Sequence, residues 1–362
     1  MQTQMLRTLT LVRLGQGKPS PEILEQFQNE GRMPRITLYE KSLGSDLLDE
    51  RYLCSLPPHT RRWYRWLSPP ASQVLEAFHA RHRYDALISW SEQLGFPLAG
   101  LLKITASDIP HVGIFSWISK PRKIRALRAI KSHFTRLILM SSVQRDAAVN
   151  LAGLRPDQVV LLRWPVDQLF WKPMPMEDDT ICAVGREMRD YGTLIAAIRD
   201  LRIPCHIAAN MSPEKKDAWI RDVEAASPLP PHLTIGKKAY PELRELYARS
   251  RFVVIPLLAT DTDNGATAIL EAMAMGKAVI CSRVKGQQDI VRDGVNGIFV
   301  APQDPRALRN AIQSLWDHPD VAHRMGQAGR AWIEKYHTLD SWVGSVRDTV
   351  IAAIDEKRRK DG

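Results

Sequence analysis

Cysteine is scarce in this chain of 362 residues, which contains only Cys54, Cys182, Cys205 and Cys281. No two of them form a CxxC pair, so their spacing excludes a disulfide framework and the usual pattern of a zinc site. Cys182 and Cys281 fall inside predicted strands, which favours a packing role. We therefore expect free thiols in a reducing compartment, and hence a cytoplasmic protein.

Long apolar runs are also missing, and no segment is long and apolar enough to span a bilayer. The apolar start of the chain is broken by Arg7 and Arg13, which indicates a first strand rather than a signal peptide. Apolar residues make up 44% of the chain and charged residues 25%, which is ordinary for a globular protein. The length predicts two domains.

Acidic residues are fewer than basic ones, 40 against 50, which gives a formal net charge of +10. This charge suits anionic partners such as a nucleotide diphosphate, an anionic membrane surface or nucleic acid, and by itself it does not choose among them. The basic segments contain no recognised nucleic-acid motif, so we expect no nucleic-acid partner.

The most informative stretch covers residues 263–302. An apolar run at 252–256 predicts a buried strand before it, and residues 266–275 have helix-forming composition and end at Gly276. A second strand is predicted at 278–282, and a third at 298–300. Strand, loop, helix and strand in so few residues predict a βαβ unit of a parallel sheet.

The loop before that helix is the candidate binding site. Gly265 lets a ligand approach the backbone, and the N–H groups of Gly265, Ala266 and Thr267 at the helix N-terminus favour a phosphate. Glu271, further along the helix, could accept hydrogen bonds from ribose hydroxyls. The alternative is that Gly265 is only a turn and Glu271 a solvated helix residue.

The same stretch, through LEAMAMGKAVI, Gly286, QQDIV, DGVNGIFV and Asp304-Pro305, resembles the signature of family 4 of the retaining glycosyltransferases. The resemblance implies the α/β GT-B fold, with two Rossmann-like domains facing across a cleft. The family's first acidic residue, usually Glu, is here Asp263, eight positions before Glu271.

The resemblance also implies the donor site. Arg186, after Gly185, corresponds to the family's diphosphate-binding Arg, and its guanidinium suits bidentate contacts to phosphate. The family's Lys five residues later is replaced by Tyr191, so Arg189 is the candidate for the second cation; the alternative is that Arg189 is an exposed loop cation.

Two further segments complete the implied site. In the family the backbone after Gly236 lies along the nucleobase, which makes Lys237 and Lys238 candidates there. A His that faces the donor sugar is replaced by Ser116, while His111 is expected to be structural.

The resemblance implies a domain plan: an acceptor domain at 1–172, a nucleotide-sugar domain at 173–338, and a helix at 339–362 that crosses back to the first domain. The boundary is expected after WPVDQLFWKP, in the Pro- and Met-rich segment that follows. A glycine pair often follows the family's first strand; the nearest candidates here are Gly15 and Gly17.

Several features of the first half leave alternatives open. Residues 35–39 predict a strand. Ser91 and Glu92 are candidates for acceptor contact, although Glu92 also suits a helix N-terminus. The segment 61–67 (RRWYRWL) is either an interfacial or sugar-contacting surface or a short helix whose aromatics pack into the core. The basic segment 120–137 predicts an amphipathic helix, whose basic face is either exposed to solvent or bound to anionic lipid.

Together these features lead us to expect a retaining hexosyltransferase that uses a UDP- or GDP-sugar and needs neither metal nor another cofactor. The acceptor would be a glycan, a lipid-linked molecule or a small-molecule hydroxyl. The expected localisation is cytoplasmic, with a peripheral position on the inner face of the membrane left open. The alternatives are a sugar-nucleotide epimerase or hydrolase, or a donor-binding scaffold on the same fold.

Overall fold

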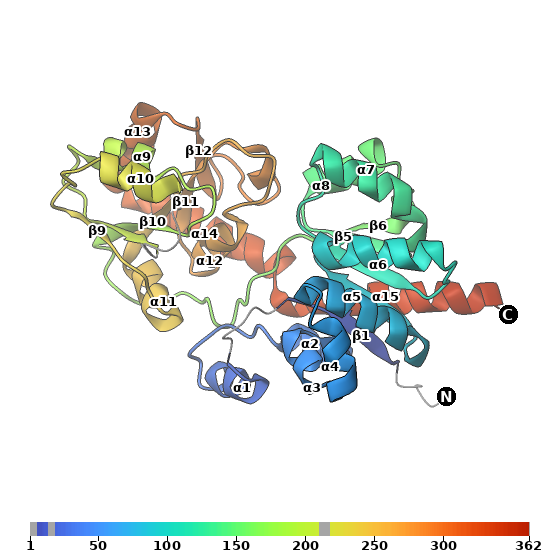
Figure 1. Cartoon of the computed structure of the whole chain (residues 1–362). Coiled ribbons are helices and arrows are strands. Elements are labelled where there is room, and N and C mark those ends of the chain that lie inside the picture. Colours follow the sequence, from blue (N-terminus) through green and yellow to red (C-terminus); the bar gives the residue numbers. More distant parts are fainter. Residues whose placement is uncertain (1–5, 14–18, 210–217, 362) are drawn as a thin grey trace. The chain divides into compact units, whose positions relative to one another are not determined.

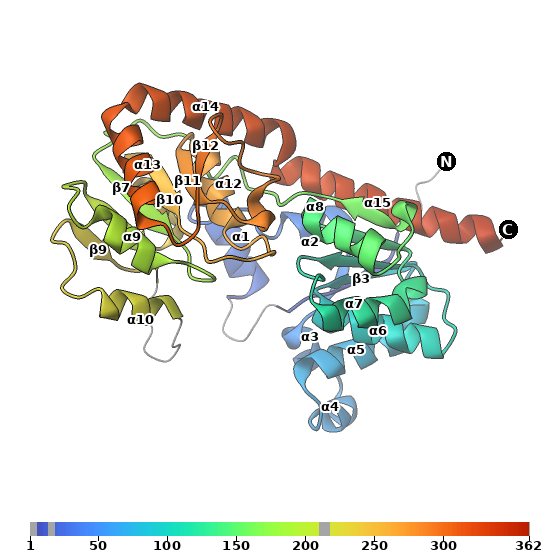
Figure 2. The same ribbon diagram turned by 90° about the horizontal axis from the view of Figure 1, so that it is seen from above.

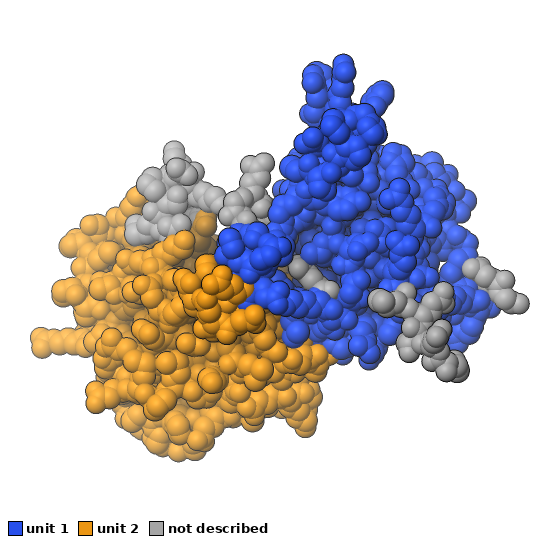
Figure 3. All heavy atoms as spheres, turned by 90° about the horizontal axis from the view of Figure 1, so that it is seen from below, with its two compact units in different colours: residues 1–25, 36–163, 342–362 blue, residues 26–35, 164–341 orange. Residues whose placement is uncertain are grey.

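The computed structural model describes residues 6–13, 19–209 and 218–361 and shows an α/β protein with two six-stranded parallel sheets (Figure 1). The chain divides into two compact units (Figure 3). Unit 1 comprises residues 1–25, 36–163 and 342–362, and unit 2 comprises residues 26–35 and 164–341. Gly15 and Gly17 lie outside the described residues.

Unit 1 contains a sheet with the strand order β2-β1-β3-β4-β5-β6, in which all pairs are parallel. Short, apolar strands are typical of parallel sheets covered on both faces. The strands are β1 (Thr8–Leu11), β2 (Asp46–Leu48), β3 (Ala86–Trp90), β4 (His111–Phe115), β5 (Arg136–Leu139) and β6 (Val159–Leu161). The helices up to residue 163 are α1 (Pro21–Asn29), α2 (Leu38–Leu43), α3 (Glu50–Ser55), α4 (Pro58–Tyr64), α5 (Pro69–Ala80), α6 (Glu92–Ile104), α7 (Pro121–Ile130) and α8 (Ser142–Asp146).

Unit 2 contains a sheet with the order β12-β11-β10-β7-β8-β9, again with parallel pairs throughout. Two apolar clusters form its core, one containing Trp171 and Met273 and the other Trp219 and Ile280. The strands are β7 (Thr180–Val184), β8 (Cys205–Ala208), β9 (Leu233–Ile235), β10 (Ser250–Ile255), β11 (Ala278–Ser282) and β12 (Gly297–Val300). The helices after β7 are α9 (Tyr191–Ile198), α10 (Ala218–Ala225), α11 (Tyr240–Arg249), α12 (Ala266–Ala274), α13 (Pro305–Asp317), α14 (Pro319–Tyr336) and α15 (Leu339–Asp361), of which α15 lies mostly in unit 1.

The observed division differs from the expected boundaries. Residues 164–172 belong to unit 2, where Phe170 and Trp171 are buried in its core, so the boundary expected after residue 172 lies at 163/164. Residues 339–341 also belong to unit 2, and α15 passes into unit 1 from Trp342 onward. An excursion of residues 26–35 into unit 2 was not expected at all.

The strand predicted at 35–39 is absent; these residues form a turn that leads into α2. The reason is a distant carboxylate: the Arg35 backbone N–H donates to Asp167 at 2.7 Å, and its guanidinium binds both Asp167 and Asp340. Because the Arg35 N–H is bonded to this carboxylate, it is not available for hydrogen bonding to a neighbouring strand. The second strand is instead β2, which pairs with β1.

The basic helix predicted at 120–137 is shorter, because α7 ends at Ile130. Phe134 and Leu137 continue the apolar spacing and are fully buried, but Leu137 lies in β5 and Phe134 stacks on His111 with ring centroids 4.7 Å apart. An apolar spacing of three to four does not show where a helix stops before a buried strand.

The alternative in which the aromatics of 61–67 pack into the core is wrong for both tryptophans: Trp63 is 80% exposed and Trp66 is 78% exposed. Only Tyr64 turns inward, where its hydroxyl donates to Glu76 at 2.9 Å. Of the helices in the described part of the chain, none combines the length and the apolar character needed to cross a bilayer.

Candidate active site

The candidate site lies at the carboxyl edge of the sheet in unit 2. From β7 the chain proceeds to β8 and β9 on one side and then returns to β10, β11 and β12 on the other. The direction therefore reverses between β7 and β10, and open α/β sheets bind ligands outside the carboxyl ends of strands at such a point.

Two loops at this switch point are bonded to each other. The loop after β7 covers residues 185–190, and the loop after β10 begins at Pro256. Asp190 donates its N–H to the Pro256 carbonyl, and Leu258 donates to the Met188 carbonyl, both at 3.0 Å. Arg189 and Leu257 form an isolated antiparallel bridge between the loops. The chain thus holds the ends of its two central strands in one arrangement.

Arg189 lies at the centre of this arrangement. Its side chain donates to the carbonyls of Val184 and Glu187, each at 2.8 Å, and the residue is 4% exposed. Its guanidinium packs on Gly185, whose φ is +105°, so closely that a Cβ at 185 would lie 2.2 Å from an Arg189 nitrogen. The interpretation of Arg189 as an exposed loop cation is therefore wrong, since the loop turns the guanidinium inward.

Tyr191 stands where the resemblance predicts a lysine, and it supports the loop after β7. The residue is fully buried, its hydroxyl donates to the Gly185 carbonyl at 2.6 Å, and its ring packs edge-on against Trp219. Tyr191 therefore stabilises the loop through this hydrogen bond, but it supplies no positive charge. Arg186, half-buried in the turn beside Gly185, remains the cation that the resemblance predicts at this position.

The N-terminus of α12 faces the same edge. Gly265 is its N-cap residue with φ +98°, a conformation that glycine adopts without a Cβ penalty. Ala266 is buried and its N–H donates to the Asp263 carbonyl at 3.0 Å, while Thr267 is exposed. The predicted phosphate contact of the Ala266 N–H therefore competes with a bond that closes the turn.

Glu271 is half-buried, which contradicts the alternative of a solvated helix residue. The Tyr247 hydroxyl donates to its carboxyl at 3.0 Å. Burial raises the pKa of Glu271 to about 7, against the opposing effects of this hydrogen bond and of the positive charge on Arg189. A carboxyl that titrates near neutrality, next to a buried arginine, is a common mark of a functional site.

Asp263 is positioned by residues that the sequence did not single out for this purpose. The Trp164 indole N–H donates to its carboxylate. Gln287 donates to the Asn264 carbonyl at 2.7 Å, and Gly286 approaches Thr262 so closely that a Cβ would lie 1.7 Å from its carbonyl oxygen. In the sequence, Gly286 of the signature was the signal for this close approach to Thr262. No sequence signal indicated the contact between Trp164 and Asp263.

The residues predicted for the nucleobase lie at the same edge, after β9. Gly236 donates its N–H to the Ile207 carbonyl at 3.1 Å, and its own carbonyl lies 3.2 Å from a ring nitrogen of His206. Lys237 is exposed and Lys238 half-exposed. β8 separates this loop from β7, so the candidate residues extend along the edge rather than forming one cluster.

Ser116 belongs to unit 1, where it is half-buried after β4, and all other residues predicted for the donor site belong to unit 2. His111 is fully buried and bonded to the Ser89 hydroxyl at 2.8 Å, as expected for a structural residue. Its ring stays neutral, because burial lowers the pKa of His111 to about 4.

The carboxyl edge of unit 1 has its own switch point, between β1 and β3. A pocket of about 160 Å³ lies there, lined largely by apolar and aromatic side chains that include Tyr39 and Trp90. Directly after β3, Ser91 adopts φ +112°, a rare conformation for a residue with a side chain, and its buried hydroxyl has no partner among the described residues. Glu92 accepts from the Trp117 N–H at 2.9 Å and so ties the β4 loop to α6.

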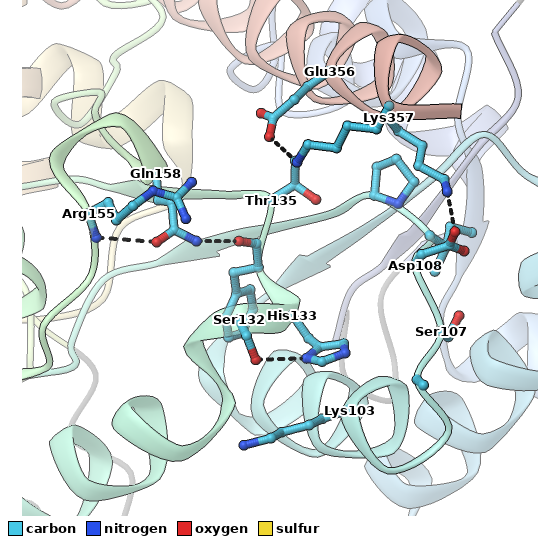
Figure 4. A pocket seen from close by; sticks show the side chains of 15 residues that line it. Lys103, Ser107, Asp108, Ser132, His133, Thr135, Arg155, Gln158, Glu356 and Lys357 are labelled. Carbon is cyan, nitrogen blue, oxygen red and sulfur yellow. Dashed lines mark hydrogen bonds and ion pairs between the residues drawn. The ribbon is translucent and has the colours of Figure 1, made fainter. Parts of the chain in front are cut away.

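A larger cavity, of about 650 Å³, lies at the opposite, amino edge of the same sheet (Figure 4). Its charged side chains are paired with one another or with neighbours: Lys357 with Asp108, and Glu356 with Arg136 and Lys360. Ser132 and His133 are bonded together at 3.0 Å. The cavity is therefore a neutralised surface feature and not part of the candidate site. Within the described ranges, no three His, Cys, Asp or Glu side chains are grouped to hold a metal ion.

Comparison with known proteins points to glycosyltransferases. Residues 174–332 match the family model of glycosyl transferases group 1. Over 311 residues the chain is 26% identical to D-inositol 3-phosphate glycosyltransferase 1 from Catenulispora acidiphila, covering 76% of this chain and 69% of that one. Over 318 residues it is 24% identical to alpha-maltose-1-phosphate synthase from Mycolicibacterium smegmatis, covering 75% of this chain and 72% of that one.

Solved structures show the same fold. Sucrose-phosphate synthase from Thermosynechococcus elongatus has a TM-score of 0.74 at 18% identity, over 96% of this chain and 100% of that chain. Anabaena HepE, solved in complex with UDP and glucose, has a TM-score of 0.70 at 16% identity, over 95% of this chain and 99% of that chain. At such identities the likeness concerns the fold alone, and the two parallel sheets are those of the GT-B enzymes.

Proposed function

We propose that this chain moves a sugar from a nucleotide-diphosphate sugar to an acceptor hydroxyl, with retention at the anomeric carbon. The match of residues 174–332 to the family model of glycosyl transferases group 1 supports the transfer. The observation that carries the proposal is the switch point of unit 2, where Arg186, the inward-turned Arg189, the α12 N-terminus and Glu271 share one sheet edge. The retention and the hexosyl group rest on the family resemblance.

The reaction breaks the bond between the anomeric carbon and the diphosphate oxygen, and it joins that carbon to the acceptor oxygen. The acceptor's proton leaves with the diphosphate. Negative charge therefore grows on the leaving group, and fixed positive charge at that place lowers the barrier. Arg186 would contact the diphosphate directly, and Arg189 would add a second, buried charge behind Gly185.

The remaining residues would orient the donor. The N–H groups at Gly265 and Thr267 would receive a phosphate at the positive end of α12. Glu271 would accept hydrogen bonds from the ribose, and Asp263, fixed by Trp164, would hold the sugar hydroxyls. The loop of Gly236, Lys237 and Lys238 would border the nucleobase, and Ser116 the sugar. The arginines and backbone N–H groups would make a metal or further cofactor unnecessary.

The apolar pocket beside Tyr39 and Trp90 in unit 1 favours an acceptor with an apolar part, bound near Ser91. A lipid-linked acceptor combines such a part with a sugar hydroxyl. A donor-binding scaffold without turnover is the second candidate, because Tyr191 brings no cation to the lysine's position. Product analysis with and without an acceptor separates transfer, hydrolysis or epimerisation, and mere binding.

The test is a thermal-shift screen against UDP-, GDP- and ADP-sugars, since a ligand that binds only the folded state raises its melting temperature. At a concentration about 100 times the Kd, one nucleotide class is expected to stabilise the protein by about 2.7 kcal/mol, a shift of several degrees. UDP is the first expectation, in line with the HepE complex. The absence of a shift with every nucleotide sugar would contradict the proposal.

A further inference from the structure

Two tryptophans of unit 1 are left in solvent. Trp63, on α4, and Trp66, just after it, are 80% and 78% exposed, and Leu67 is 40% exposed. Isolated apolar residues are normal on a surface, but two nearly bare indoles three positions apart indicate a binding surface. α4 projects from unit 1 (Figure 2), so both side chains lie on an accessible tip.

The exposure is built into the segment. Proline at 57, 58, 69 and 70 limits the helical element between them. Tyr64 fastens α4 to α5 through its hydroxyl bond to Glu76, and the Ser72 hydroxyl donates to the Tyr64 carbonyl at 3.5 Å. Tyr64 is turned inward, whereas the side chains of Trp63 and Trp66 are exposed to solvent. The Arg65 guanidinium lies 4.7 Å from the Trp66 ring, a cation–π contact that also faces solvent.

The charge around the tryptophans has one sign. Arg61, Arg62 and Arg65 are exposed, and the sequence from 51 to 75 contains no Asp or Glu. Arginine with tryptophan is the composition of membrane–water interfaces, where the indole sits at headgroup level and the guanidinium reaches phosphates. A protein partner would need a concentrated acidic surface to match, whereas an anionic bilayer supplies that charge over its whole area.

Apolar surface continues beyond the tip. A groove of about 540 Å³ begins at Ser68 and Pro70 and runs between α5 and α6, lined mainly by apolar side chains. Ile104, at the end of α6, borders this groove and is 83% exposed. Helix α7, the basic helix of the sequence analysis, differs: Ile124 and Leu127 are buried, and Lys123 and Arg128 bond to carbonyls of unit 1.

We propose that the surface formed by Arg61, Arg62, Trp63, Arg65, Trp66 and Leu67, here called the α4 tip, docks unit 1 onto an anionic phospholipid bilayer. The tryptophans enter the headgroup region, the arginines pair with lipid phosphates, and the groove with Ile104 lies beside the entry point. The tip, rather than α7, is the membrane contact, because α7 offers charge without a large exposed apolar side chain. This inference does not depend on the donor chemistry of unit 2.

The experiment measures co-sedimentation of the full chain with vesicles of phosphatidylcholine alone and of phosphatidylcholine with phosphatidylglycerol. The wild-type protein is expected to sediment with the anionic vesicles at low salt and to be released from them at high salt. Trp63→Ser/Trp66→Ser should remove binding at all salt concentrations. Arg61→Glu/Arg62→Glu/Arg65→Glu should weaken binding at low salt by about 100-fold or more. Brominated lipids should quench the fluorescence of wild type more than that of the tryptophan variant.

The matched control is Lys120→Glu/Arg122→Glu/Arg125→Glu, at the N-cap of α7 and on α7 itself, which changes the charge equally and should retain the tryptophan-dependent binding. Melting curves and the nucleotide-sugar thermal shift, which reports on unit 2, verify that each variant is folded. Failure of wild type to bind anionic vesicles, undiminished binding of the tryptophan variant, or loss of binding only in the α7 control would overturn the proposal. So would self-association through Trp63 and Trp66 in place of vesicle binding.

Discussion

The two sheets follow the same plan but carry different loops. In each, the first strand lies inside the sheet, and the chain reverses beside it, at β1/β3 in unit 1 and at β7/β10 in unit 2. The edge of unit 2 carries arginines, a glycine-capped helix and a titrating carboxyl. The edge of unit 1 carries an apolar pocket and the strained Ser91.

The match to the family model lies entirely within unit 2. An edge that binds a nucleotide diphosphate, as proposed for unit 2, needs each hydrogen-bond donor in a particular place, and this requirement would leave a signature in the sequence. An apolar pocket and an exposed tip can be built from many residue combinations. We infer that unit 2 determines the donor chemistry and unit 1 the acceptor and its location, and substitutions should separate these two roles.

The largest effect is expected from Gly286→Ala in unit 2. The new Cβ would lie 1.7 Å from the Thr262 carbonyl oxygen, so the 262–264 loop must move and take Asp263 with it. A displacement of about 1 Å at such a site is expected to lower kcat/KM about 100-fold. Steady-state kinetics and a melting curve measure this.

The control for Gly286→Ala is Gly100→Ala on α6 of unit 1, where a Cβ meets nothing within 4 Å. Alanine in a helix is favoured over glycine, so this variant should keep wild-type kinetics and melt at the same or a slightly higher temperature. Wild-type kinetics in a folded Gly286→Ala protein would show that the 262–264 loop takes no part in donor binding.

An effect of comparable or smaller size is expected from Arg186→Ala. Loss of a charge-assisted contact to the diphosphate costs about 1.5–3 kcal/mol, which lowers kcat/KM about 10- to 150-fold. Binding of anionic vesicles, assigned to unit 1, should stay unchanged. Arg202→Ala, an exposed arginine of the same unit, is the control and should behave as wild type. If both variants keep full kcat/KM, Arg186 is not a diphosphate ligand.

Much of this fold could be predicted from the sequence where local signals agree. The strands around residues 252–256 and 278–282 are apolar and β-branched, and a helix with a glycine at each end separates them. The structure confirms these elements and the α/β class. The strands of unit 1 at 86–90 and 111–115 were predicted for the same reason.

What the sequence did not predict depends on specific hydrogen-bond partners, some of them far away in the chain. Residues 35–39 have strand-forming side chains, yet Arg35 is held by Asp167, 132 positions away. The inward turn of Arg189 depends on carbonyls of its own loop, and the position of Asp263 depends on Trp164. Periodicity and propensity do not report such contacts, which arise only once the chain is folded.

The smallest and most specific effect is expected at Glu271. If the Glu271 carboxylate accepts hydrogen bonds from the ribose, the protein with ionised Glu271 binds the donor more tightly than the protein with protonated Glu271. Because burial raises the pKa of Glu271 to about 7, the affinity for the nucleotide sugar should increase as the pH rises from 6 to 8. Glu271→Gln should bind about tenfold more weakly at pH 8, a loss of about 1.4 kcal/mol, and should lack this pH dependence.

The same shift affects stability without ligand, in the opposite direction. Between the ordinary carboxyl pKa of 4.5 and about 7, folded Glu271 keeps a proton that the unfolded chain has lost. The folded state binds more protons, so this residue makes the free energy of unfolding fall as the pH rises through that window. Titration calorimetry and urea melts at pH 5 and pH 8 measure both trends. Glu245→Gln, an exposed position on α11, is the control, and equal pH profiles for wild type and Glu271→Gln would show that this carboxyl neither titrates near neutrality nor contacts the donor.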